Sequence, residues 1–87
     1  MSKVEIYTWQ SCPFCIRAKH LLNNKKIEFI EYQIDGDSKA RETMSNIANG
    51  RRTVPQIFIN DKGIGGCDEL YRLEEENELD SLISPDV

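Results

Sequence analysis

Two cysteines three positions apart, Cys12 and Cys15, enclose a proline and a phenylalanine and lead directly into an amphipathic pattern. A C-x-x-C pair can bind a metal, form a structural bridge or work as a redox pair. Zinc usually takes four nitrogen or sulfur ligands, and beyond this pair the sequence offers only Cys67 and His20. We therefore expect no metal site. Three cysteines in 87 residues are also too few, and odd in number, for a disulfide framework.

The position of Cys12 gives the pair an asymmetry that suits redox chemistry. Pro13 fits the first position of a helix, where its missing N–H costs nothing, so Cys12 takes the N-cap. Unpaired N–H groups and the helix dipole both favour a thiolate there. Cys15 lies one turn further on and should be less exposed. This predicts that Cys12 attacks a disulfide and that Cys15 resolves the resulting mixed disulfide. An inert buried pair remains the alternative, and Pro13 disfavours it.

The composition limits the classes of function. Apolar residues make up 39% and charged residues 30% of the chain, and the formal net charge is −4. Nucleic acid is disfavoured as a partner, because phosphate backbones are bound mainly through excess Lys and Arg. No apolar run approaches the roughly 20 residues of a membrane span. The opening residues lack the features of a signal peptide, so we expect a cytoplasmic protein in a reducing compartment, with residues 1–87 forming a single domain.

The elements that position the cysteines follow from hydrophobic spacing and turn residues. Residues 4–9 alternate as a half-buried strand, and Gly50 suits the end of a helix. Asp68 is expected to cap the last helix, with a break near Asn77. The predicted strands span residues 4–9, 27–34 and 56–59 plus a short arm at 63–66, and the helices begin at Pro13, Ser38 and Asp68. The order βαβαββα predicts an α/β fold in which helices flank a four-stranded mixed sheet.

Three sequence motifs and the separations between them resemble those of a known family. They read YTWQSCPFC, RRTVPQIFI and GGCDEL, and together they resemble the dithiol C-P-[YF]-C class of glutaredoxins, of bacterial or organellar type. The similarity runs from Val4 to about Leu82. It implies a thioredoxin-like fold and a cis peptide bond between Val54 and Pro55. From the residues alone, Pro55 could equally begin the third strand in the ordinary trans form.

The resemblance also implies an activity and a ligand. The activity is glutathione-dependent thiol-disulfide oxidoreduction through Cys12 and Cys15, with glutathione as co-substrate and no permanently bound cofactor. The partners implied are disulfide-containing or glutathionylated proteins, and we expect a monomer. Glutathione carries a carboxylate at its glycine end, and the candidates to bind it are Arg52, Arg51 and Gln56. The residues expected to bind glutathione are Phe14, Arg52, Thr53, Val54, Pro55, Gly66, Cys67 and Asp68.

Two features leave alternatives open. Many family members carry a lysine where this chain has Trp9, so Arg52 would carry more of the carboxylate binding here. Cys67 is expected to be a buried small residue, without a catalytic role. The competing functions are a thioredoxin-like carrier reduced by a flavoprotein reductase, and a module holding an iron–sulfur cluster. The first should lack the R-T-V-P and G-G-C-D motifs, and the second typically has glycine in place of Pro13.

Overall fold

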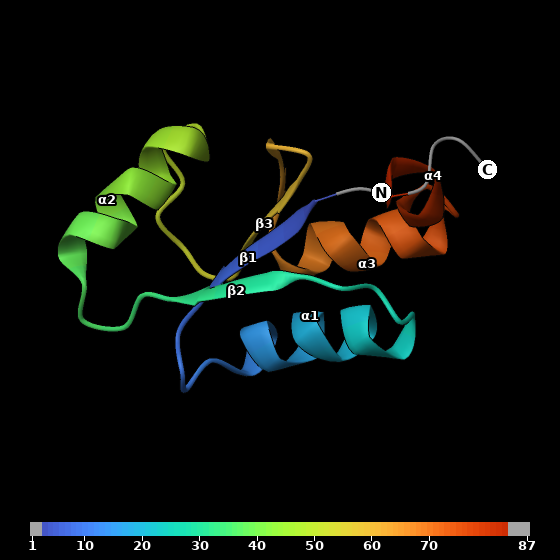
Figure 1. Ribbon diagram of the computed structural model, residues 1–87, viewed down its shortest axis with the longest axis horizontal. Coiled ribbons are helices and arrows are strands. Elements are labelled where there is room, and N and C mark those ends of the chain that lie inside the picture. The colour runs from blue at the N-terminus through green and yellow to red at the C-terminus, as the bar shows by residue number, and fades with distance from the viewer. Residues whose placement is uncertain (1–2, 84–87) are drawn as a thin grey trace.

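The computed structural model describes residues 3–83. Strands and helices alternate in the first half, and a β-hairpin followed by two helices completes the chain (Figure 1). The elements are β1 (Val4–Thr8), α1 (Pro13–Asn24), β2 (Ile30–Gln33), α2 (Ser38–Ile47), β3 (Gln56–Ile59), β4 (Lys62–Gly65), α3 (Cys67–Glu75) and α4 (Leu79–Ile83). Within the described residues, no helix is long and apolar enough to cross a membrane.

The strands form one mixed sheet in the order β2-β1-β3-β4. β1 runs parallel to β2 and antiparallel to β3, and β3 pairs with β4 as a hairpin. The predicted four-stranded mixed sheet is therefore confirmed. Because α1 begins just beyond the carboxyl end of β1, the C-x-x-C pair lies at that end of the sheet (Figure 1).

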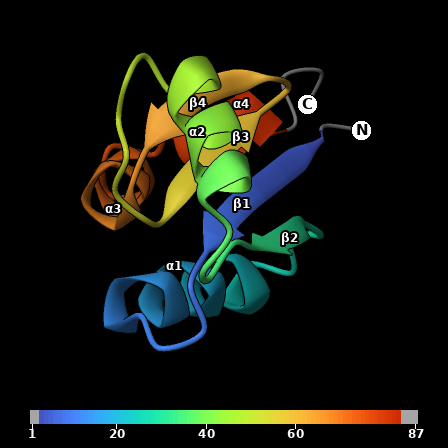
Figure 2. The same ribbon diagram turned by 90° about the vertical axis from the view of Figure 1, so that its left-hand side faces the viewer.

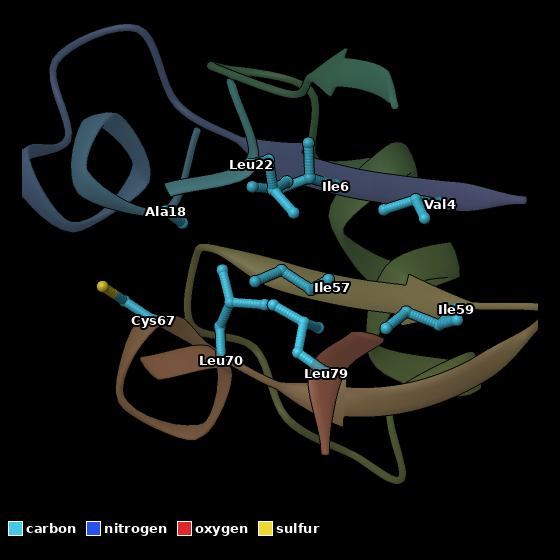
Figure 3. Packing of buried hydrophobic residues seen from close by; sticks show 9 residues of the cluster. All are labelled: Val4, Ile6, Ala18, Leu22, Ile57, Ile59, Cys67, Leu70 and Leu79. Carbon is cyan, nitrogen blue, oxygen red and sulfur yellow. The ribbon is translucent and has the colours of Figure 1, made fainter. Parts of the chain in front are cut away.

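The core lies between the sheet and the two helices α1 and α3. Val4 and Ile6 of β1 face Ile59 and Ile57 of β3, and all four side chains are almost fully buried. The alternation predicted for the first strand is thus confirmed. The core residues are Val4, Ile6, Ala18, Leu22, Ile57, Ile59, Cys67, Leu70 and Leu79 (Figure 3).

The opposite face of the sheet carries aromatic rings. The Tyr7 ring lies 4.8 Å from that of Tyr32 and 5.7 Å from that of Phe58, measured between centroids. The end of α2 reaches this face, since a Cβ on Gly63 would meet the Phe58 ring at 3.1 Å and the Ile47 carbonyl at 3.9 Å. Figures 1 and 2 together show that α2 stands apart from α1 and α3.

Several boundaries of the predicted elements were wrong by one residue or more: β1 ends at Thr8, β2 ends at Gln33 and β4 spans Lys62–Gly65. Local geometry explains two further differences. The second strand begins at Ile30 and not at residue 27, because Lys26 has a φ of 57° and the chain turns there. Ile27 and Phe29 still pack against the core, which accounts for their apolar character. The second helix ends at Ile47, three residues before Gly50, although Gly50 has the expected positive φ of 87°.

The last helix also differs from the prediction. It is divided into α3 and α4, and Asn77 between them has a φ of 59°, which confirms the expected break. The order is therefore βαβαββαα. Asp68 is not the N-cap. Gly66 takes that position, and Asp68 lies in the first turn of α3.

Candidate active site

Cys12 is the N-cap of α1, as its spacing from Pro13 predicts. Its backbone is extended, with φ −127° and ψ 107°, and the backbone N–H of Cys15 donates to Cys12 Sγ at 3.1 Å. The same sulfur lies 3.9 Å from the carbonyl oxygen of Val54. The first turn of α1 thus offers a hydrogen-bond donor to a thiolate at Cys12.

Cys15 has a different environment from Cys12. It is 1% exposed, against 8% for Cys12, and both are free thiols. Burial, followed by its hydrogen bond with Cys12, raises the pKa of Cys15 to about 12. At neutral pH, Cys15 therefore stays protonated as long as Cys12 is not part of a disulfide. The predicted roles require such a difference between the two thiols.

The peptide bond between Val54 and Pro55 is cis, as the family resemblance implied. This segment joins α2 to β3 and runs beside the cysteine pair, where the Val54 carbonyl approaches Cys12. Gln56, the first residue of β3, is buried, and its side-chain amide donates to Thr53 Oγ1 at 3.1 Å. That bond ties Gln56 to the loop and holds the loop against the sheet.

A cavity of about 180 Å³ lies next to this loop. Every residue predicted to bind glutathione lines this cavity except Arg52, and its neighbour Arg51 lines the cavity instead. The lining residues are Phe14, Arg51, Thr53, Val54, Pro55, Gly66, Cys67, Asp68 and Glu69. Three segments far apart in the sequence therefore meet beside the cysteine pair.

A wider hollow of about 750 Å³ lies at the other end of the sheet. Its walls include Lys3, Lys26 and Phe29, near the starts of β1 and β2. None of the cysteines lines it. The smaller cavity is the candidate site, because the carbonyl of its lining residue Val54 lies 3.9 Å from Cys12 Sγ.

The start of α3 is held by Glu69, which the sequence analysis did not single out. Glu69 Oε1 accepts from the backbone N–H of Gly66 and lies 3.4 Å from Arg51 Nη2. The hydrogen bond from Gly66 is the main reason that the pKa of Glu69 lies below its usual range. A glutamate three residues after the N-cap is the sequence signal of this capping arrangement. The two remaining predicted residues at this end differ: Cys67 is buried, and Asp68 is exposed.

Arg41 is a second residue that the sequence analysis missed. Its guanidinium lies 4.8 Å from the centroid of the Trp9 ring, and its Nε donates to the carbonyl oxygen of Arg52 at 3.0 Å. A cation therefore stacks on Trp9, the position at which the family resemblance implies a lysine. The position of Arg41 in the middle of an amphipathic helix gives no sequence signal of this contact. The indole N–H of Trp9 is buried without a hydrogen-bond partner among the described residues.

The thiol pair, the cis-proline loop and the N-terminus of α3 define a dithiol redox protein built on a mixed sheet. Comparison with known proteins agrees. The family model of glutaredoxins matches residues 4–64. A probable glutaredoxin of Synechocystis is 65% identical over 95% of this chain and 76% of its own length, and glutaredoxin 3 of Escherichia coli is 52% identical over 95% and 99%. A dithiolic glutaredoxin of Trypanosoma brucei brucei, solved in solution, is 36% identical with a TM-score of 0.83, covering 95% of this chain and 88% of that one.

The chain belongs to the glutaredoxin family. Its fold is accordingly thioredoxin-like, and its activity is glutathione-dependent thiol-disulfide oxidoreduction through a cysteine pair. Within residues 3–83, no three His, Cys, Asp or Glu side chains are grouped so that they could hold a metal ion.

Proposed function

We propose that this protein reduces protein disulfides and glutathione mixed disulfides, with Cys12 attacking and Cys15 resolving. The observation that carries the assignment is the hydrogen bond from the Cys15 N–H to Cys12 Sγ at 3.1 Å, together with the deeper burial of Cys15. The Cys12 thiolate attacks one sulfur of the substrate disulfide, and the other sulfur leaves as a thiolate that takes up a proton. Glutathione then attacks the mixed disulfide and releases Cys12.

For a protein disulfide, Cys15 takes the place of the first glutathione. The Cys12–Cys15 bond forms, the bond from Cys12 to the substrate breaks, and the substrate leaves fully reduced. Two molecules of glutathione then reduce the new disulfide and become oxidised. The cytoplasm is the reducing compartment that we propose for this cycle, and we propose that the monomer is the working form.

Glutathione is proposed to lie in the cavity beside Cys12. Val54 can pair its backbone with that of the tripeptide, as an added strand does. The N-terminus of α3 at Gly66 and Cys67 can receive the γ-glutamyl carboxylate, and Asp68 can receive the ammonium group. Phe14, Thr53 and Pro55 complete the walls, as lining residues of the cavity.

The glycine-end carboxylate needs a cation. Arg52 and Arg51 are the candidates from the sequence, and Arg51 is supported by its place in the cavity lining. Arg41 adds a third candidate, because its guanidinium is fixed by the Trp9 ring and by the Arg52 carbonyl. The loss of a lysine at position 9 is then offset by an arginine from α2.

The test compares native protein with Cys12→Ser and Cys15→Ser, using glutathione, glutathione reductase and NADPH. With a small glutathione mixed disulfide as substrate, we expect native protein and Cys15→Ser to turn over and Cys12→Ser to fall to background. With a peptide that contains an intramolecular disulfide, Cys15→Ser should lose most of its activity as well. Inactivity of native protein here, combined with reduction by a thioredoxin reductase, would contradict the proposal.

A further inference from the structure

An ion pair between Lys19 and Glu31 ties α1 to the edge strand β2. Glu31 Oε2 accepts from Lys19 Nζ at 2.8 Å and from Thr8 Oγ1 at 2.7 Å. Thr8 is fully buried, and the side chains of Lys19 and Glu31 are each 26% exposed. Burial raises the pKa of Glu31, but the hydrogen bonds from Lys19 and Thr8 outweigh it and leave the pKa lowered. The carboxylate therefore stays charged and holds the lysine at neutral pH.

Lys19 lies one helical turn after Cys15. Residues four apart share a helix face, and helical side chains lean toward the N-terminus. Lys19 therefore follows Cys15 on one face of α1, and its ammonium group is held 2.8 Å from Glu31 Oε2. A lysine in this position is ordinarily mobile, but here Glu31 restricts it. Its positive charge lowers the pKa of Cys15, against the larger opposing influences of burial and Cys12.

The surroundings of Cys15 change when Cys12 is occupied. Apart from burial, the influences that raise the pKa of Cys15 come from Cys12, through its hydrogen bond and its charge. In a mixed disulfide, Cys12 carries no charge, so its electrostatic influence disappears. The influences that still favour ionisation are the hydrogen bond with the Trp9 backbone and the charge of Lys19. Lys19 therefore gains importance at the step in which Cys15 must become a thiolate.

We propose that Lys19, held in place by Glu31, stabilises the Cys15 thiolate in the resolving step, with Glu31 acting as a positioning residue. The Cys15 thiolate attacks Cys12 Sγ, the Cys12–Cys15 bond forms, and the bond from Cys12 to the substrate sulfur breaks. The electron pair goes to the leaving sulfur, and the proton lost from Cys15 goes to solvent. This inference rests on the proposed dithiol function.

The experiment follows one reaction in a stopped-flow instrument. The probe is dithiobis-nitrobenzoate, an aromatic disulfide that releases one coloured thiolate when Cys12 attacks it and a second when Cys15 resolves the mixed disulfide. All proteins carry Cys67→Ser, so that two cysteines remain. The variants are Lys19→Met, Lys19→Arg and Glu31→Gln. The matched control is Lys25→Met, which removes another paired lysine, at the C-cap of α1, bound to Glu74 at 2.9 Å and Asp80 at 3.1 Å.

We expect Lys19→Met to slow the second phase about tenfold at neutral pH, so that a given rate requires a pH about one unit higher. The first phase should be unchanged. Lys19→Arg, which keeps the charge, should restore most of the rate, and Glu31→Gln should give an intermediate loss. Lys25→Met should behave as the native protein does.

Several results would overturn the inference. One is an unchanged second phase in Lys19→Met, and another is an equal loss in Lys19→Met and Lys19→Arg, which would indicate packing and not charge. If Lys19→Met fails to fold, Glu31→Gln decides, because an unchanged pH profile in that variant excludes a held lysine. Failure of the underlying dithiol function looks different, since Cys15→Ser would then still release the second thiolate.

Discussion

At the scale of single residues, Cys12 and Cys15 show how one helical turn can give two thiols different tasks. Cys12 receives an N–H bond at the helix start, whereas Cys15 is buried with its pKa raised to about 12. A thiol that stays protonated does not compete for substrate. In the proposed mechanism, the pair therefore presents one nucleophile to a substrate and keeps the second for the following step.

The two arginines near the cavity allow a prediction that single substitutions can test. We expect Arg51→Met to raise the KM for glutathione about tenfold, as loss of a charged hydrogen bond does. Arg52→Met is the matched comparison, because Arg52 does not line the cavity and contributes its carbonyl to Arg41. Steady-state kinetics with varied glutathione measure both. A larger effect of Arg52→Met would indicate that the carboxylate binds near Arg52 and would contradict our choice of Arg51.

At the scale of elements, the junction of β4 and α3 depends on glycine. Gly65 has a φ of 108°, and a Cβ there would lie 2.6 Å from Glu69 Oε1 and 2.9 Å from Arg51 Nη1. The side chain that caps α3 thus occupies the space in which a larger residue would stand. Glu69 and Arg51, which form this wall of the cavity, can therefore keep their positions only if residue 65 has no side chain.

We expect Gly65→Ala to lower the free energy of unfolding by about 3 kcal/mol, through backbone strain and displacement of Glu69. The matched control is Gly36→Ala, where φ is 66° but no atom lies within 4 Å of the added Cβ. That variant should cost about 1 kcal/mol, from strain alone. Urea denaturation measures both. Equal losses would show that the contact with Glu69 is relieved at no cost.

Element types could be predicted from the sequence, whereas several boundaries could not. The period of two in β1 and the proline after Cys12 are local signals, and the structure follows them. The start of α3 depends instead on a choice between two capping residues, Gly66 and Asp68. Glu69 decides it by accepting a hydrogen bond from the Gly66 N–H, and a rule that ranks single residue types does not include this contact.

At the scale of the whole molecule, the C-terminal helix closes the core. Leu79 of α4 is fully buried against the sheet side of α3, and Lys25 at the end of α1 bonds Glu74 and Asp80. One short helix is thereby joined to both helices of the core layer. We infer that α4 unfolds together with the rest of the domain.

Leu79→Ala should lower the free energy of unfolding by about 2–5 kcal/mol, as cavity formation in a core does. Ile47→Ala is the control, because Ile47 is 52% exposed and its loss should cost less than about 1 kcal/mol. Denaturant titration followed by circular dichroism measures both. A small effect of Leu79→Ala would mean that α4 is detached from the cooperative core.

Long-range placement was the part of the site least accessible from the sequence. The three motifs were recognisable because each is continuous along the chain. Arg41 on α2 and Glu31 on β2 gain their roles only when the fold brings them to Trp9 and Lys19. Arg51 and Arg52 are neighbours in the sequence, so only the direction of the backbone separates the one that lines the cavity from the other.

The two reactive sulfurs belong to a single turn at the beginning of one helix. A covalent bridge between them closes a very short loop, and short loops remove less chain entropy than long ones. Because both sulfurs lie within this one turn, we expect the sheet and the other helices to keep their places when the bond forms or breaks. We therefore expect reorganisation during turnover to be confined to the first turn of α1.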